Sequence, residues 1–270
     1  MIDASLPGTP DFPTTAANVL RGLQARICAA FEALDPGAKF GETIWTKPPE
    51  HRLKGTGYMR VMRGSVFEKV GVNVSHVWGA LSEAGMKQIP GAVESNGQFS
   101  ACGISLVAHM TNPFVPTVHM NVRTMATSKW WFGGGADLTP TFPLDDDTKD
   151  FHGALKAACD GYRPGAYDEY KAWCDKYFFL PHRNEPRGVG GIFFDDLNSG
   201  DGAKDWAFVQ SVGEAFLAVY PKIVARRKDT PYTDADREKL FLKRGRYVEF
   251  NLVYDRGTRF GFMTDANPDA

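Results

Sequence analysis

The fold of this chain is decided by Gly103-Ile104-Ser105-Leu106-Val107-Ala108-His109 and by His119-Met120-Asn121-Val122-Arg123. In both stretches every second residue is apolar, and an extended strand points successive side chains to opposite faces. The intervening Thr111–Pro116 segment contains two prolines and is typical of a short turn that joins antiparallel neighbours. The sequence therefore predicts two adjacent antiparallel strands, each with one apolar and one polar face.

The polar face of these strands carries chemically useful groups. His119, Asn121 and Arg123 place a proton-transfer group, a neutral hydrogen-bonding group and a carboxylate clamp in one row. Ser105 and His109 share a face of the neighbouring strand. A solvated sheet face is the alternative interpretation, but such a face usually carries Lys, Glu and Thr. The pattern favours a functional site.

A third stretch, Tyr247–Asp255, alternates in the same way, with Glu249, Asn251 and Asp255 on its polar side. The following residues 255–261 fit the turn of a hairpin. We expect Arg256 and Arg259 in this turn either to pair with nearby acids or to bind substrate.

The rest of the chain mixes both kinds of structure. Apolar residues at helical spacing predict helices over 18–34, 82–88, 147–179, 205–227 and 234–244, and glycine-punctuated short strands over 40–75. There are no internal repeats or credible linkers. The sequence therefore predicts a single α+β domain, residues 1–270, whose helices cover a large antiparallel sheet.

Bulk properties exclude several functions. The net charge of −1 and the absence of a basic block argue against nucleic-acid binding and against a membrane surface. No apolar run approaches the ~20 residues that span a bilayer, and the N-terminus lacks the pattern of a signal peptide. The four cysteines are scattered, which favours buried free thiols in a reducing compartment and hence a cytoplasmic protein.

Two glycine-rich segments lead into acids. Gly133-Gly134-Gly135 precede Asp137, and such glycines in a strand require a reason such as a bulge or a close backbone approach by a ligand. A tight turn with a capping Asp is an equally good interpretation. In the segment Arg187–Leu197 the paired acids Asp195 and Asp196 fit strand termination better than catalysis, and Arg187 is a second candidate clamp for an anionic substrate.

In order along the chain, these segments resemble the oxygen-dependent coproporphyrinogen III oxidase family. The resemblance runs from about Phe67 to Asn267. It rests on Phe67-Glu68-Lys69, Ser105–His109, Asn112-Pro113, His119–Arg123, Trp131–Pro140, Trp173-Cys174-Asp175, His182-Arg183-Asn184-Glu185, Arg187–Asn198 and Gly245–Gly261. A long ordered match is far more specific than any single motif among them.

The resemblance implies a large antiparallel sheet with helices on both faces. It also implies a homodimer whose contact begins near Tyr247. The implied reaction converts two propionates of coproporphyrinogen III to vinyls and gives protoporphyrinogen IX, CO2 and H2O2 in haem biosynthesis. Molecular oxygen is the co-substrate and no organic cofactor is needed, which agrees with the absence of a dinucleotide fingerprint.

The resemblance also implies roles for individual residues. His119 matches a proton donor, and Asp137 or Asp255 fits an acid that pairs with pyrrole N–H groups. Divalent metal, such as Mn²⁺, is implied at the four histidines His109, His119, His152 and His182, although their spacing matches no compact metal motif. Substrate contacts are implied at Ser105, Asn121, Val122, Arg123, Asp265, Ala266 and Asn267, and Arg187 fits a propionate clamp.

The chain departs from the family pattern in two places. The segment 124–129 is short, and the sequence ends at Ala270 where family members continue with an apolar strand and a tail. We therefore expect the C-terminal tail of the family to be missing here. Two alternative functions remain open at this point: a porphyrin- or haem-binding carrier without catalysis, and a metal-dependent hydrolase or oxygenase built from the histidines.

Overall fold

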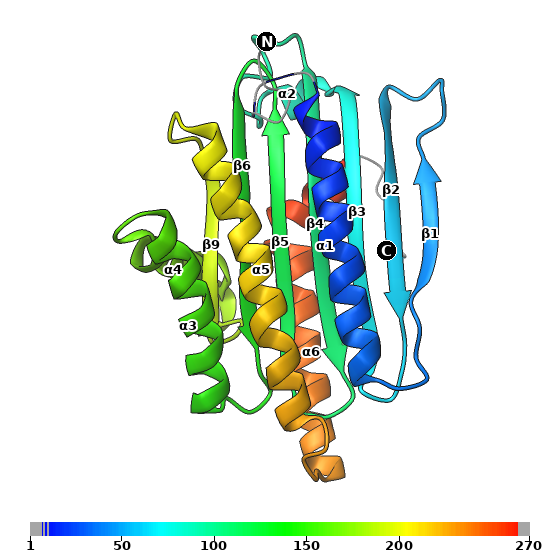
Figure 1. The fold of residues 1–270 in the computed structure, drawn as a ribbon, viewed down its shortest axis with the longest axis vertical. Helices are drawn as coiled ribbons and strands as arrows, with labels where there is room; N and C mark the ends of the chain where they lie inside the picture. The colour runs from blue at the N-terminus through cyan, green and yellow to red at the C-terminus, as the bar shows by residue number, and fades with distance from the viewer. Residues whose placement is uncertain (1–6, 8, 10, 264–270) are drawn as a thin grey trace.

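A seven-stranded antiparallel sheet forms the centre of the molecule, as a computed structural model that describes residues 7, 9 and 11–263 shows (Figure 1). Six strands follow one another as a meander, and the last strand joins the far edge next to β6. In spatial order the strands are β1 (Gly41–Thr46), β2 (Leu53–Met62), β3 (Phe67–Ala80), β4 (Gln98–Met110), β5 (Thr117–Ala126), β6 (Trp130–Thr139) and β9 (Gly190–Leu197).

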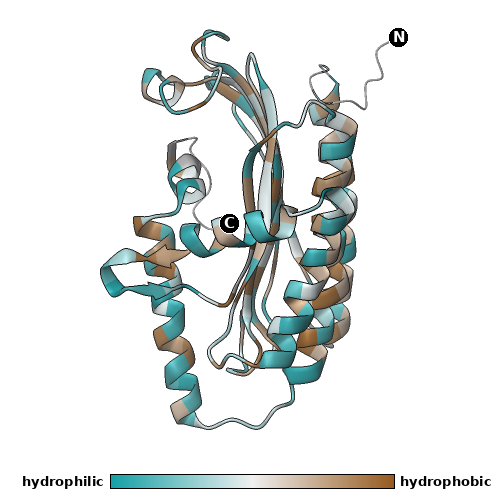
Figure 2. Ribbon diagram, turned by 90° about the vertical axis from the view of Figure 1, so that its left-hand side faces the viewer, coloured by the Kyte–Doolittle hydropathy of each residue, from teal (hydrophilic) through white to brown (hydrophobic). Residues whose placement is uncertain are grey.

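Helices lie on both faces of this sheet, as the view in Figure 2 shows. One face is covered by α1 (Phe12–Leu34), α3 (Asp145–Tyr162) and α5 (Gly202–Arg227). The opposite face carries α6 (Asp234–Val253) and α7 (Arg256–Met263), and α2 (Glu83–Met86) lies at one end of the sheet. The helix α4 (Ala166–Tyr177) packs against β9, and a small two-stranded sheet of β7 (Phe179–Leu180) and β8 (Glu185–Pro186) encloses the 3-10 turn Pro181–Arg183. The predicted α+β fold is confirmed.

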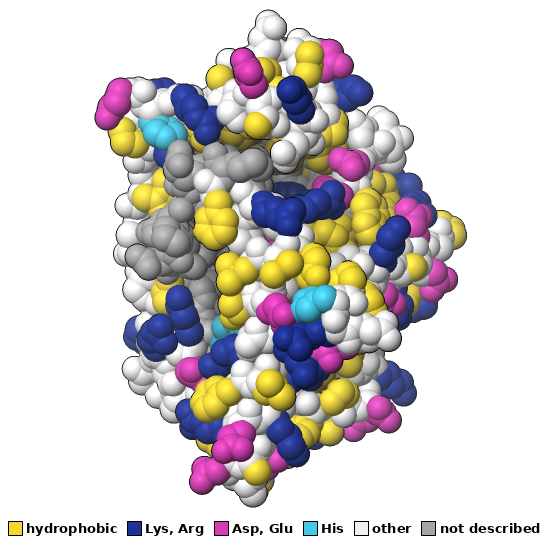
Figure 3. Space-filling view, turned by 180° about the vertical axis from the view of Figure 1, so that it is seen from behind, with side chains coloured by type: hydrophobic (Ala, Val, Ile, Leu, Met, Phe, Trp, Pro, Cys, Tyr) yellow, Lys and Arg dark blue, Asp and Glu magenta, His cyan; other side chains and the backbone are white. Residues whose placement is uncertain are grey.

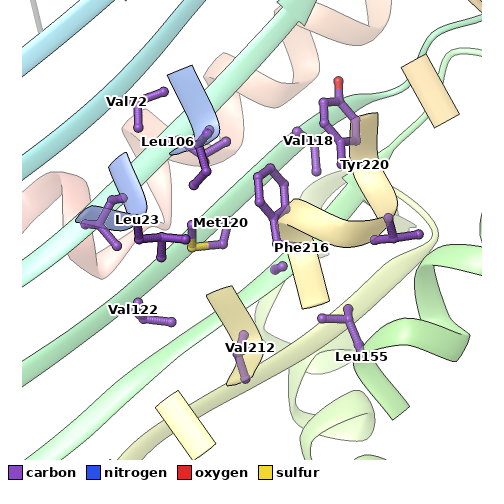
Figure 4. Packing of buried hydrophobic residues seen from close by; sticks show 14 of the residues in the cluster. Leu23, Val72, Leu106, Val118, Met120, Val122, Leu155, Val212, Phe216 and Tyr220 are labelled. Carbon is purple, nitrogen blue, oxygen red and sulfur yellow. The ribbon is translucent and has the colours of Figure 1, made fainter. Parts of the chain in front are cut away.

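The main core lies between the sheet and the helices α1, α3 and α5. Alternate strand residues such as Leu106, Val118 and Met120 point into it and meet Leu23 of α1 and Phe216 of α5 (Figure 4). All five are almost fully buried. Since one set of alternate residues fills this core, the other set must face α6 and α7. The predicted strands around Ser105 and His119, and the turn between them, are confirmed.

The C-terminal part of the prediction was wrong. Tyr247–Val253 continues α6 as a helix, and the residues expected to form a hairpin form α7. The alternation of Val248, Phe250 and Leu252 that suggested a strand does not follow burial, since Val248 and Leu252 are exposed. Tyr247 and Phe250, three apart, are buried, whereas Leu252 is 61% exposed. A capping box at Thr233 starts the helix, and helical propagation then carries through the ambiguous segment.

Asp35 joins α1 to the sheet and makes fold stability sensitive to acid. Its carboxylate accepts hydrogen bonds from the backbone N–H groups of Ser65, Val66 and Phe67 and from the Ser65 hydroxyl. Burial alone would raise the pKa of Asp35, but these hydrogen bonds outweigh it and hold the pKa below its ordinary value. A depressed pKa means that the stabilisation is present above the pKa of the unfolded chain, about 4, and is lost as pH falls through the folded value.

We therefore expect Asp35→Ala to lower the free energy of unfolding by about 3 kcal/mol at pH 7, because buried N–H groups lose their acceptor. Urea denaturation at pH 7 and at pH 3 measures the difference. The gap between wild type and variant should shrink at pH 3. An equal gap at both pH values would contradict the assignment.

Candidate active site

The sheet face that points away from the main core is organised in rows across the strands. Asn73, Ser105, Asn121 and Gly135 are successive register partners on β3, β4, β5 and β6. One step along the strands, Val107, His119, Asp137 and Gly191 form the next row. The predicted polar row on β5 is therefore real, and it continues sideways onto neighbouring strands.

His119 and Asp137 form a directly paired acid/base couple within one row. The imidazole Nδ1 lies 2.9 Å from Asp137 Oδ1, and the other carboxylate oxygen accepts a hydrogen bond of 2.6 Å from Arg187 Nη2. Asp137 is only 2% exposed. Burial by itself would raise the pKa of Asp137, but the Arg187 charge and the His119 contact reverse this and hold it below its ordinary value. An ionised carboxylate therefore sits behind the imidazole.

Asp255 lies near the same region, and both of its carboxylate oxygens accept hydrogen bonds from within the protein. It precedes α7, and its Oδ2 accepts hydrogen bonds from the backbone N–H and the hydroxyl of Thr258, as an N-terminal cap does. Its Oδ1 accepts a hydrogen bond of 2.8 Å from the Tyr177 hydroxyl. These bonds offset its burial, which acts in the opposite direction, so the pKa of Asp255 lies below its ordinary value.

Arg123 follows Asn121 by two residues on β5 and points to the same face. Its guanidinium is held in place by two contacts. Its Nη1 donates to Asn121 Oδ1 at 2.7 Å, and its Nη2 lies 2.9 Å from Asp195 Oδ2. Arg256 reaches the same carboxylate oxygen at 3.3 Å. Two guanidinium groups thus converge on one acid from β9. Asp195 is their internal counter-ion. It also lies near the end of β9, where its Oδ1 accepts a hydrogen bond from the Asp196 backbone N–H, so the strand ends at the predicted acids.

The consecutive glycines make room for this arrangement. A Cβ atom on Gly133 would lie 2.4 Å from Asp195 Oδ1 and 2.8 Å from Arg123 Cζ, so any side chain there collides with the ion pair. Gly135 has φ +151°, where a Cβ would meet the Ile192 carbonyl oxygen. The predicted bulge is confirmed by a register shift between Phe132 and Gly134, and the alternative of a tight turn is wrong because the three glycines lie inside β6. The close approach of a ligand stays a prediction.

Two small apolar clusters flank the polar rows on this face. One contains Leu53, Phe99, Met125 and Trp131, and the other contains Cys174, Phe178, Leu180, Phe193 and Phe250. Met125 follows Arg123 by two residues on β5 and so shares its face. Figure 3 shows this side of the molecule, where Lys and Arg side chains lie beside a hollow among hydrophobic side chains. The face offers apolar walls with cations between them.

The remaining predicted substrate contacts are distributed unevenly. Ser105 lies on the site face beside Asn121. Val122 is 0% exposed and its side chain packs in the main core, so only its main chain borders the site strands. Arg187 is buried against Asp137 and does not line an open surface. Asp265, Ala266 and Asn267 lie outside the described residues.

The four histidines implied as metal ligands do not form one donor set in the described part of the chain. His152 of α3 contacts Tyr167 through Nδ1 and the Val189 carbonyl through Nε2. His182 contacts Tyr254 and Glu249 through its two nitrogens. His109 on β4 stacks edge-on to Tyr247, and burial, followed by the Arg244 charge, lowers its pKa to about 4. Among the described residues no group of three or more His, Cys, Asp or Glu side chains could hold a metal ion.

Several residues of the site escaped the sequence analysis. Asn251 was expected on a strand, but on α6 its side chain accepts a hydrogen bond from Arg187. Tyr177 and Phe178 at the end of α4 contact Asp255 and His119, respectively. The aromatic pair Tyr177-Phe178 before a proline-containing turn was the available signal, but nothing in its spacing connects it to a strand 60 residues earlier.

These features together define an enzyme of acid/base chemistry whose substrate is both apolar and anionic. Comparison with known proteins agrees. The family model of coproporphyrinogen III oxidase matches residues 15–270. The chain is 52% identical over 258 residues to the oxygen-dependent coproporphyrinogen-III oxidase of Rickettsia bellii, covering 92% of this chain and 90% of the relative. It is 49% identical over 263 residues to that of Rickettsia akari, covering 94% and 92%. The chain belongs to the coproporphyrinogen III oxidase family, and the resemblance read from the sequence is confirmed.

Proposed function

We propose that this protein catalyses the oxygen-dependent conversion of coproporphyrinogen III to protoporphyrinogen IX in haem biosynthesis. For each of two propionates the balance is R–CH2–CH2–COO⁻ + O2 + H⁺ giving R–CH=CH2 + CO2 + H2O2. Membership of the family and the identity of about half of all residues with its curated members support the activity. The observation that carries the chemistry is the pair formed by the partly exposed His119 and the buried Asp137, beside the Arg123–Asp195–Arg256 cluster.

The residues of this face fit the demands of that substrate. A tetrapyrrole with four carboxylates needs cations at its rim and apolar contact for its rings. Arg123 can bind a propionate bidentately when Asp195 yields its place. Both oxygens of Asp137 and both of Asp255 are already hydrogen-bonded. His119 Nε2 has no hydrogen-bond partner among the described residues, so it is the atom we assign to proton exchange with the substrate.

In this mechanism the substrate supplies the electrons. Transfer of a pyrrole N–H proton toward His119 leaves an electron-rich ring that O2 can attack. The pyrrole peroxide then takes a hydrogen from the side chain as the bond to CO2 breaks. Breaking of the C–CO2 bond supplies the electron pair of the new C=C bond, and breaking of the C–O bond passes two electrons to the peroxide. The peroxide takes its second proton from the His119 imidazolium and leaves as H2O2, and the pyrrole nitrogen takes up the H⁺ of the overall balance, so that a vinyl group remains. The protein's contributions are orientation of the propionates and a proton acceptor of fixed geometry.

Oxygen uptake with coproporphyrinogen III, followed by chromatography of the tetrapyrroles, tests the function. We expect two O2 consumed and two CO2 released per protoporphyrinogen formed. Tight binding of the tetrapyrrole with no oxygen uptake would instead establish the carrier that the sequence left open.

Metal removal is a separate test. Since the four histidines do not converge in the described residues, no step above is assigned to a metal. We expect turnover to stay within about twofold after EDTA treatment and after addition of Mn²⁺. Removal of a metal ion that took part in catalysis would instead cost several kcal/mol of transition-state stabilisation, a far larger loss of turnover. A large loss in EDTA that Mn²⁺ restores would contradict this expectation and support the metal assignment.

We further propose a homodimer that forms through α6. Phe241, Val248 and Leu252 lie on one side of this helix at helical spacing, and each is between 45% and 61% exposed. An exposed apolar stripe of this kind is typical of a protein–protein interface, and a second copy of the chain is the partner that the family resemblance implies near Tyr247.

Leu252→Asp should therefore convert the dimer to a monomer, which light scattering after size exclusion measures. Ile44→Asp is the matched control, since Ile44 on the edge strand β1 is also exposed, at 58%, but lies on another part of the sheet. The proposed α6 interface would be contradicted if both variants, or neither of them, changed the molar mass of the protein in solution.

We also propose a cytoplasmic location. All four cysteines are free and buried, as predicted. Among the described residues no helix is long and apolar enough to cross a membrane.

A further inference from the structure

Arg187 occupies an unusual place for a residue predicted to bind a substrate carboxylate. Its side chain is 2% exposed, and both of its terminal nitrogens are engaged inside the protein. Nη2 donates to Asp137 Oδ2 at 2.6 Å, and Nη1 donates to Asn251 Oδ1 at 2.9 Å. Arg123 and Arg256, by contrast, are 30% and 58% exposed. A substrate carboxylate can reach those two arginines but not Arg187.

Aromatic rings fix the plane of this guanidinium. Its Cζ lies 4.0 Å from the centre of the Phe178 ring, 4.4 Å from that of Tyr247 and 4.9 Å from that of Phe250. These cation–π contacts favour the charged group and exclude water from it. Phe178 also lies edge-on to the His119 ring, with the ring centres 6.0 Å apart. Phe178 therefore contacts both Arg187 and His119.

The chain of contacts runs from Arg187 through Asp137 to His119. Arg187 neutralises Asp137 in a region that water does not reach, so the carboxylate stays ionised. An ionised carboxylate can only accept hydrogen bonds, so Nδ1 of His119 must be the nitrogen that carries hydrogen. Nε2, on the opposite side of the ring, is then left to exchange a proton with substrate. This is the division of labour of a carboxylate-oriented catalytic histidine.

We propose that Arg187 is a positioning residue that keeps Asp137 ionised and in place, and thereby fixes the tautomer and orientation of His119. The proposal rests on the proposed function. Arg187 also ties the pair to α6, because its second hydrogen bond ends on Asn251 of that helix. Val248 and Leu252 on the outer side of α6 belong to the proposed dimer stripe. Docking of α6 and alignment of the catalytic pair are therefore linked through one side chain.

Two variants of the full-length enzyme test this role. Arg187→Met removes the charge and keeps much of the volume, whereas Arg187→Lys keeps the charge but loses the fork that bonds Asp137 and Asn251 together. Arg246→Gln is the control: Arg246 also lies on α6 and pairs with Glu185 at 2.9 Å, outside the catalytic row. We expect kcat to fall by about 100-fold or more in Arg187→Met and by about 10-fold in Arg187→Lys, with KM changed less than about threefold. Arg246→Gln should stay within about twofold of wild type.

¹⁵N NMR of the His119 ring supplies a readout that does not depend on activity. In the neutral form of the ring, wild type should carry its hydrogen on Nδ1, and Arg187→Met should lose that single-tautomer pattern while the fold, followed by circular dichroism, is kept. A wild-type tautomer and wild-type kcat in Arg187→Met would overturn the proposal, as would a large rise in KM with unchanged kcat, which would return Arg187 to substrate binding. If wild type itself shows no oxygen uptake but has the expected tautomer, the proposed function fails and the positioning role stands.

Discussion

Asp137→Asn should lower kcat by about 10³- to 10⁴-fold, the size of effect seen when the carboxylate behind a catalytic histidine becomes an amide. The amide oxygen would stay with the donor Arg187, so the amide N–H would face His119 Nδ1. Nδ1 would then have to accept, and the hydrogen would move to Nε2. The imidazole would present the wrong nitrogen state to the substrate although its position would scarcely change.

The same change leaves the Arg187 charge buried without a counter-ion. We expect the free energy of unfolding to fall by about 3 kcal/mol, within the range for breaking a buried ion pair. Oxygen uptake measures the change in kcat, and urea denaturation measures the change in the free energy of unfolding. Asp160→Asn is the control, because Asp160 forms an exposed pair with Lys156 and such pairs contribute well under about 1 kcal/mol. Normal kcat in Asp137→Asn would remove Asp137 from the mechanism.

Arg123→Met should act on binding and not on proton transfer. It removes one of the two guanidinium groups that converge on Asp195 and so one propionate partner. A half-buried charge-assisted bidentate contact contributes about 2–3 kcal/mol, which corresponds to a roughly 30- to 150-fold loss in kcat/KM. We expect most of that loss in KM, as initial rates over a range of substrate concentrations will show.

Arg123→Lys is the matched comparison. It keeps the charge but offers no planar fork, so its KM should fall between those of wild type and Arg123→Met. A variant with unchanged KM and reduced kcat would mean that Arg123 acts on the reacting carbon and not on a propionate.

The sheet was predictable from the sequence because its signals are local. Period-two alternation around Ser105 and His119, joined by a proline turn, determines two strands, their pairing and which face of each is polar. The site row on β5 followed directly. Tyr247–Val253 failed because its period-two alternation does not follow burial. The buried residues Tyr247 and Phe250 are three apart, as on one face of a helix, and the capped helix that precedes them continues through the segment.

Contacts across the sheet were not predictable. Arg187 and Asp137 are 50 positions apart, and Arg187 and Asn251 are 64 apart, so no spacing rule connects them. The sequence identified Arg187 only as a second candidate clamp for an anionic substrate, because a guanidinium binds carboxylates. The burial of Arg187 depends on the rings of Phe178, Tyr247 and Phe250. The role of Asp195 as a counter-ion depends partly on Arg256 of α7, which is similarly distant in sequence.

The meander gives this protein a particular order of assembly. Strands β1 to β6 pair with their immediate neighbours in the chain, so their loop-closure entropy is small and their hairpins can form early. The last strand pairs with β6 only after two helices have intervened, and α6 comes later still. We therefore expect the pairing of β1 to β6 to precede the docking of Asn251 and α6. We expect refolding to pass through a stage with native strands and no activity, in which docking of the C-terminal helices is the slow, concentration-dependent step that makes the enzyme competent.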